Sequence, residues 1–145
     1  MNNTLTIALV GIGGYGKHNV NAVLDATPQR RIRLVGTIDP APQSCHRWDE
    51  IQRLGAPHFA SLEEFYKSNH ADLVAIASPI PFHADQVCLA LEHGSHVMCE
   101  KPLCATPQEA QRIIDAHSKS KLHAAIGYQW SFSGAIQELK ADVLS

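Results

Sequence analysis

Three glycines near the start of the chain, Gly11, Gly13 and Gly16, are spaced as G-x-G-x-x-G. Such a loop can hold a pyrophosphate, because the missing Cβ at Gly13 lets phosphate oxygens approach the backbone. Gly11 permits a sharp reversal of the chain, and Gly16 lets the next helix pack tightly on the preceding strand. The N–H groups and dipole of that helix then face the phosphates. We therefore expect a dinucleotide to contact the whole loop, namely Gly11, Ile12, Gly13, Gly14, Tyr15 and Gly16.

The surroundings of the loop decide whether this pattern is more than a glycine-rich turn. A β-rich apolar stretch, residues 4–10, precedes it, and a helical pattern begins at Lys17. A second strand, residues 32–38, ends in Asp39, at the distance expected for a ribose-binding acid. A carboxylate there binds ribose hydroxyls and repels a 2′-phosphate, so NAD is favoured, with NADP possible because Arg47 follows. An acidic residue opening a turn is the alternative for Asp39.

Lys101 lies in the tripeptide Glu100-Lys101-Pro102, directly after a predicted strand at 96–99. Beside a nicotinamide, its ammonium can hydrogen-bond a substrate hydroxyl and favour proton loss as hydride leaves. A solvated loop lysine is the alternative, because most lysines are exposed.

Strand and helix patterns alternate along the chain, which predicts an α/β fold: one doubly wound parallel sheet, the Rossmann fold. Ligands of such sheets bind beyond the carboxyl ends of the strands. The glycine loop, Asp39, residues 78–83 and residues 100–102 each follow a predicted strand, so we expect them at one edge. The other expected elements are a helix at 40–54, strands at 58–60, 72–77 and 123–126, and helices beginning at 62, 84, 107 and 133.

Composition excludes several classes of protein. The chain has 145 residues, enough for one domain, and its net charge of −2 gives no electrostatic case for nucleic acid or an anionic membrane. Neither a signal peptide nor a long apolar run is present, so a cytoplasmic location is expected. The four cysteines form no C-x-x-C motif, and the nine histidines are scattered along the sequence, so no metal site is expected.

The motifs together resemble the N-terminal half of the Gfo/Idh/MocA oxidoreductase family over essentially the whole chain. They are the glycine loop, Asp39, Ser78-Pro79-x-x-x-His83 and Glu100-Lys101-Pro102-Leu103. The resemblance implies NAD(P)-dependent hydride transfer at a sugar or cyclitol alcohol, with Lys101 as the active-site lysine. It also implies that Ser78, Pro79, His83 and Glu100 border the cofactor. An equal alternative for His83 is a structural role, in which it lies in the first turn of a helix and its ring hydrogen-bonds a backbone group.

Two departures from the family pattern stand near the end of the chain. Many members carry an arginine where residues 127–132 read Gly-Tyr-Gln-Trp-Ser-Phe, so Tyr128 and Trp130 are expected to shape the site differently or to pack under another domain. Family enzymes also have a second α/β domain that contacts the substrate. We therefore expect a dinucleotide-binding domain at 1–130 and a connection at 131–145. The chain alone is expected to be catalytically incompetent, and apolar residues in 136–143 suggest a homo-oligomer.

Two other classes of function remain open from the residues. One is a non-catalytic NAD-binding module, or a subunit completed by a partner chain, since a binding role can also retain Lys101. The other is a methyltransferase with an adenosine cofactor, which would also place an acid at Asp39. The Glu-Lys-Pro element argues against the methyltransferase.

Overall fold

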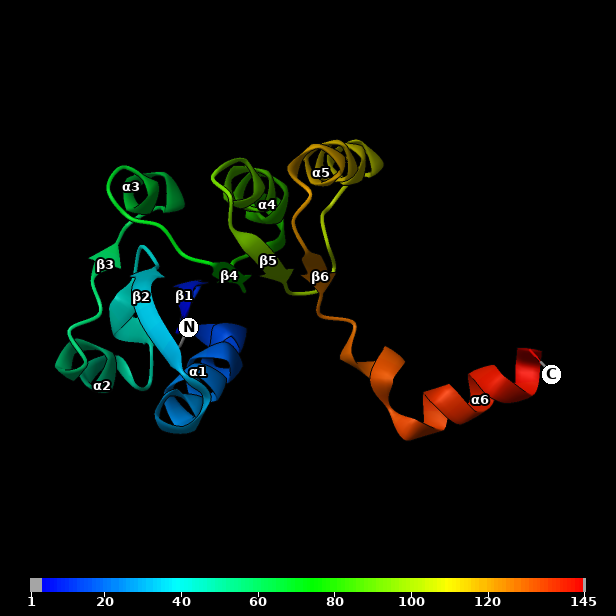
Figure 1. Cartoon of the computed structure of the whole chain (residues 1–145), viewed down its shortest axis with the longest axis horizontal. Coiled ribbons are helices and arrows are strands. Elements are labelled where there is room, and N and C mark those ends of the chain that lie inside the picture. Colours follow the sequence, from blue (N-terminus) through cyan, green and yellow to red (C-terminus); the bar gives the residue numbers. More distant parts are fainter. Residues whose placement is uncertain (1–3, 145) are drawn as a thin grey trace.

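The computed structural model describes residues 4–144 and contains one six-stranded parallel sheet with helices on both faces (Figure 1). The strands lie in the order β3-β2-β1-β4-β5-β6, and every neighbouring pair is parallel. The two halves of the sheet run outward from β1 and β4, which places a topological switch point between these strands. The predicted doubly wound sheet is thus confirmed. The strands are β1 (Leu5–Val10), β2 (Ile32–Ile38), β3 (His58–Phe59), β4 (Leu73–Ile76), β5 (His96–Cys99) and β6 (Ala124–Ile126).

The helices form two layers around the sheet. In Figure 1, α1 and α2 lie below it, α3, α4 and α5 lie above it, and α6 runs away from the body of the molecule. The bounds are α1 (Lys17–Arg30), α2 (Trp48–Arg53), α3 (Leu62–Tyr66), α4 (His83–Glu92), α5 (Pro107–Ser120) and α6 (Gly134–Leu144).

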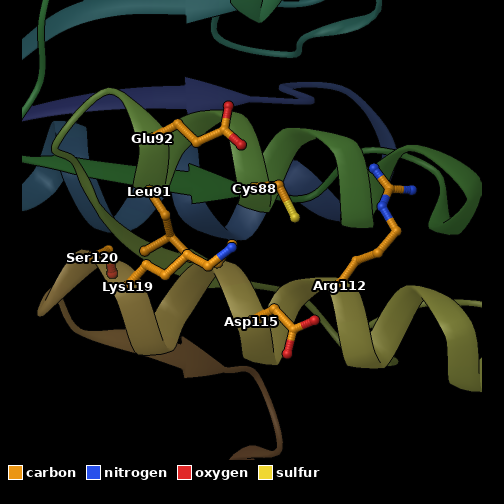
Figure 2. A pocket seen from close by; sticks show the side chains of 8 residues that line it. Cys88, Leu91, Glu92, Arg112, Asp115, Lys119 and Ser120 are labelled. Carbon is orange, nitrogen blue, oxygen red and sulfur yellow. The ribbon is translucent and has the colours of Figure 1, made fainter.

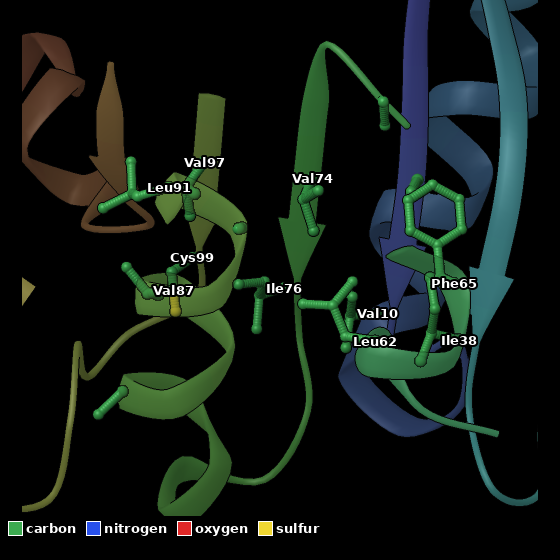
Figure 3. Packing of buried hydrophobic residues seen from close by; sticks show 14 of the residues in the cluster. Val10, Ile38, Leu62, Phe65, Val74, Ile76, Val87, Leu91, Val97 and Cys99 are labelled. Carbon is green, nitrogen blue, oxygen red and sulfur yellow. The ribbon is translucent and has the colours of Figure 1, made fainter. Parts of the chain in front are cut away.

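Each face of the sheet packs against its own hydrophobic cluster. In β1, Ala8 and Val10 belong to the cluster under α3, α4 and α5, whereas Ile7 and Leu9 belong to the cluster over α1 and α2. This alternation follows from the two-residue period of a strand, and it explains why a central parallel strand is apolar throughout. Figure 3 shows the first cluster, in which Phe65 from α3 lies by β1 and β2, and Val87 from α4 lies beside Cys99 of β5.

Side-chain caps fix the starts of two helices. The Thr106 hydroxyl accepts the N–H of Glu109 at 3.2 Å, while the Glu109 carboxylate accepts the N–H of Thr106 at 2.9 Å. This capping box begins α5 at the predicted residue, Pro107. Ser61 caps α3 in the same way, by accepting the N–H of Glu64 at 3.2 Å.

The helix predicted at residues 40–54 is wrong over its first half. The structure has a short 3₁₀ turn at Pro42–Ser44, and α2 begins only at Trp48. Proline disfavours the helical conformation of the residue before it, and Ala41 indeed has φ −135° and ψ 65°. Cys45, at ψ 122°, is also extended, so the chain cannot continue as a helix there.

Two further features lie on the surface of the described residues. No helix within 4–144 has both the length and the apolar character needed to cross a bilayer. The last segment of the chain is largely unburied: Trp130 is 76% exposed and Phe132 82%. On α6, Ile136, Leu139 and Val143 are exposed as well.

Candidate cofactor-binding site

The glycine loop turns where little room exists for side chains. Gly11 has φ +75°, and a Cβ there would lie 2.7 Å from the backbone of Ala77 and Ser78 after β4. A Cβ at Gly16 would lie 1.8 Å from the carbonyl oxygen of Gly11. These two glycines therefore let the start of α1 approach both β1 and the loop after β4. A Cβ at Gly13 would lie 2.3 Å from the hydroxyl of Ser44. The sequence did not predict that Ser44 lies beside Gly13.

Asp39 ties the end of β2 to the glycine loop. Its Oδ2 accepts the backbone N–H of Ile12 at 2.9 Å and of Gly13 at 3.4 Å. Its Oδ1 accepts the N–H of Ala41 at 2.8 Å. Each carboxylate oxygen can accept more than one hydrogen bond, so ribose hydroxyls can still donate to this group.

Arg47 is held by two carboxylates. Its guanidinium lies 2.6 Å from Glu50 Oε1 and 2.7 Å from Asp25 Oδ1. The hydrogen bond to Glu50, and to a lesser extent that to Asp25, raises the pKa of Arg47 above its ordinary value. Arg47 was expected to soften the preference for NAD over NADP. In the structure its guanidinium is already paired with Glu50 and Asp25.

His83 joins the loop after β4 to the loop after β5. It is the first residue of α4 and only 1% exposed. Its Nε2 lies 2.8 Å from the carbonyl oxygen of Ser78, and its Nδ1 lies 2.9 Å from that of Pro102. The neighbouring Ser78 hydroxyl donates to Gln86 Oε1 at 2.5 Å. The ring nitrogens of His83 are thus occupied by backbone groups, as the alternative interpretation of this residue expects.

Glu100 and Lys101 directly follow β5, and their side chains lie in different environments. Glu100 Oε2 is buried without a hydrogen-bond partner in the described structure, and it lies where a Cβ on Gly127 would be only 2.8 Å away. Lys101 is exposed, and its Nζ lies 5.6 Å from the centre of the Tyr15 ring.

Two adjoining pockets open over this edge of the sheet and share Ser78 and Pro79. The first lies on the side of β2 and has an apolar floor that includes Val10, Ile38 and Leu62. The second lies on the side of β5 and is lined by Tyr15, Ser78, Pro79, His83, Glu100 and Lys101. The structure therefore brings the sequence-predicted residues together around the carboxyl ends of β1, β2, β4 and β5.

Another pocket lies between α4 and α5, away from these residues (Figure 2). It is lined by charges of both signs, and Arg112 pairs with Asp85 at 2.7 Å beside it. Burial raises the pKa of the Cys88 thiol, which disfavours the reactive thiolate. Among the residues that the structure describes, no three metal-binding side chains gather as a metal site requires.

Gln129 is the residue of this edge that sequence reasoning missed. Its amide Nε2 donates to the hydroxyl of Tyr15 at 3.2 Å, although 114 positions separate the two residues. Tyr128 and Trp130, which were expected to shape the site, are both more than half exposed. No sequence signal distinguishes Gln129, since it is an isolated polar residue in an irregular segment.

Comparison with known proteins agrees with this arrangement. The model of the oxidoreductase family Gfo/Idh/MocA, described as an NAD-binding Rossmann fold, matches residues 5–128. The chain belongs to the Gfo/Idh/MocA oxidoreductase family. The resemblance expected from the motifs is thereby confirmed, together with the fold.

Individual relatives place the chain within that family. An inositol 2-dehydrogenase of Corynebacterium glutamicum is 28% identical over 141 residues, which make up 97% of this chain and 41% of that protein. The scyllo-inositol 2-dehydrogenase (NADP(+)) IolU of Bacillus subtilis is 34% identical over 82 residues, 57% of this chain and 25% of that protein. The chain thus spans less than half the length of these relatives.

A solved structure supports the same assignment. The WlbA dehydrogenase of Chromobacterium violaceum, crystallised with NADH and UDP-GlcNAcA, superposes with a TM-score of 0.83 at 27% identity. The match covers 99% of this chain and 41% of that one. The family's NAD-binding Rossmann fold is therefore present over residues 5–128.

Proposed function

We propose that this chain is the cofactor-binding part of an oxidoreductase that transfers hydride between NAD and an alcohol carbon of a sugar or cyclitol. The observation that carries the proposal is that Gly11, Tyr15 and Lys101 line two adjoining pockets at the edge of the sheet where Asp39 binds the glycine loop. The names of the relatives, inositol dehydrogenases among them, support the class of substrate.

The β2 side of the site fits the adenosine half of the cofactor. The apolar floor of the first pocket suits an adenine ring, and Asp39 stands where ribose hydroxyls can donate to it. The glycine loop leads directly into α1, whose first N–H groups suit a pyrophosphate. A 2′-phosphate would meet the negative charge of Asp39, while Arg47 is already paired, so we infer a preference for NAD over NADP.

The β5 side of the site fits the nicotinamide half. The buried Oε2 of Glu100 lacks a partner, and a ribose hydroxyl of a bound dinucleotide can donate to it. When bound, NAD would supply the acceptor for the hydride that leaves the alcohol carbon. The ammonium of Lys101 would donate a hydrogen bond to the alcohol oxygen and favour loss of the hydroxyl proton to water as the hydride leaves. Ser78 and Pro79 form the wall between the two halves, and His83 holds that wall against the loop that carries Lys101.

The domain organisation follows from the same proposal. Residues 1–130 serve as the dinucleotide-binding domain, and residues 131–145 begin a connection toward a substrate domain. Exposed Trp130, Phe132 and Leu139 supply an apolar surface for such a domain to cover. The named substrates of the relatives belong to proteins more than twice as long, so we expect the chain alone to bind cofactor without turnover. A cytoplasmic location and self-association stay predictions from the sequence.

Titration with NADH and NADPH, followed by energy transfer from Trp48 and Trp130, tests the proposal. Saturable binding with NADH preferred is the expected result. Binding of S-adenosylmethionine in its place would favour the methyltransferase alternative. No binding by a chain that circular dichroism shows to be folded would contradict the assignment. Restored turnover on adding a separate substrate-domain chain would instead identify a subunit completed by a partner.

A further inference from the structure

Tyr15 connects three segments that are distant in the sequence. It lies in the 3₁₀ turn of the glycine loop, and its hydroxyl accepts a hydrogen bond from Gln129 Nε2 at 3.2 Å. The ammonium of Lys101 lies over its ring, 5.6 Å from the centroid. The ring also packs against His18 of α1, with centroids 4.9 Å apart.

These contacts cross the carboxyl edge of the sheet. Tyr15 follows β1, Lys101 follows β5 and Gln129 follows β6, and β1 and β6 are three places apart in the sheet order. Three steps between neighbouring strands amount to about 14 Å. The tyrosine and glutamine side chains together span that distance, and the lysine ammonium lies beside them at the mouth of the second pocket.

Among the described residues, the Tyr15 ring is the group that contacts the ammonium of Lys101. Among residues 4–144, the ion pairs at hydrogen-bonding distance involve Arg47 and Arg112, and none involves Lys101. A flexible, exposed lysine samples many rotamers, whereas a catalytic group must be held close to its productive geometry. An aromatic face within about 6 Å attracts an ammonium by the cation–π interaction.

We propose that Tyr15 is a positioning residue for Lys101. The face of its ring holds the ammonium at the nicotinamide side of the site, and Gln129 holds the ring from the far edge of the sheet. The catalytic purpose of this arrangement rests on the proposed function, but the contact itself exists in the free protein and can be tested there.

Nuclear magnetic resonance of ¹³C-methylated lysines reports the contact directly. Reductive methylation keeps the positive charge, and the chain has six lysines, so Lys101→Arg assigns the signal of interest by its loss. In the unaltered chain, the methyl signal of Lys101 is expected upfield of the others because of the Tyr15 ring current. Tyr15→Phe keeps the ring face but loses the hydrogen bond from Gln129, so it should weaken this shift, and Tyr15→Leu should abolish it. Tyr128→Leu, at an exposed tyrosine beside Gln129, is the matched control and should leave the signal unchanged.

Each outcome bears on the proposal. A Lys101 signal among those of solvated lysines, or an upfield shift that survives Tyr15→Leu, would overturn the positioning role. Gln129→Ala gives a second reading if Tyr15→Leu fails to fold: it should weaken the shift, and an unchanged shift would remove Gln129 from the arrangement. An upfield Lys101 signal in a chain that binds no NADH would support the contact and contradict the cofactor assignment.

Discussion

Replacement of Asp39 tests whether its carboxylate holds the glycine loop in place before any cofactor binds. In the structure, Oδ2 accepts the N–H of Ile12, a fully buried residue, at 2.9 Å, and that of Gly13 at 3.4 Å. A hydrogen bond to a charged group contributes about 1.5–3 kcal/mol, and a buried N–H left without a partner costs about 1–3 kcal/mol. The longer bond to Gly13 and the solvent-accessible bond to Ala41 add little. Asp39→Ala should therefore lower the free energy of unfolding by about 2–4 kcal/mol.

Asp39→Asn provides a graded comparison. Its amide oxygen can still accept from Ile12, but that acceptor is no longer charged, so a loss of about 1 kcal/mol is expected. Urea unfolding without cofactor, followed by circular dichroism, measures both variants. Glu92→Ala, at an exposed carboxylate on the last turn of α4, is the control and should stay within about 0.5 kcal/mol of the parent. If Asp39→Ala unfolded at the same urea concentration as that control, the loop would not depend on the carboxylate.

Close contacts at Gly16, Asp72 and Lys101 give three further predictions. Gly16→Ala should cost about 3 kcal/mol or more, because the new Cβ would lie 1.8 Å from the carbonyl oxygen of Gly11; an unchanged thermal midpoint would contradict the close packing. Hydrogen bonds from the hydroxyl and N–H of Thr6 lower the pKa of Asp72, so this carboxylate stabilises the fold above the ordinary aspartate pKa, and the contribution is lost as pH falls through the lowered value. Thr6→Val should flatten the dependence of urea stability on pH below about pH 4, and equal slopes would rule the bond out. Lys101→Met should leave the Kd for NADH within about threefold, since the lysine is assigned to the alcohol oxygen; in the whole enzyme it should lower kcat, and unchanged turnover would remove its catalytic role.

Local patterns in the sequence predicted most of the fold. Apolar strands, the glycine loop and the Thr106 capping box each depend on residues near one another, so their conformations follow from local sterics and hydrogen bonds. The prediction failed at residues 40–54, where helical residues follow two prolines and the conformation of Ala41 decided the outcome.

The amino-acid sequence by itself determined the class of fold, the family and the edge of the sheet where the site lies. Parallel strands joined by helices place all their carboxyl ends together, so residues that follow strands must converge there whatever the details of packing. Only the tertiary structure decided which of those side chains meet. Asp39 binding the N–H of Ile12, His83 bridging Ser78 and Pro102, and Gln129 reaching Tyr15 all join different loops. Such contacts depend on distances of a few ångströms between segments far apart in the chain, and no spacing within the sequence encodes them.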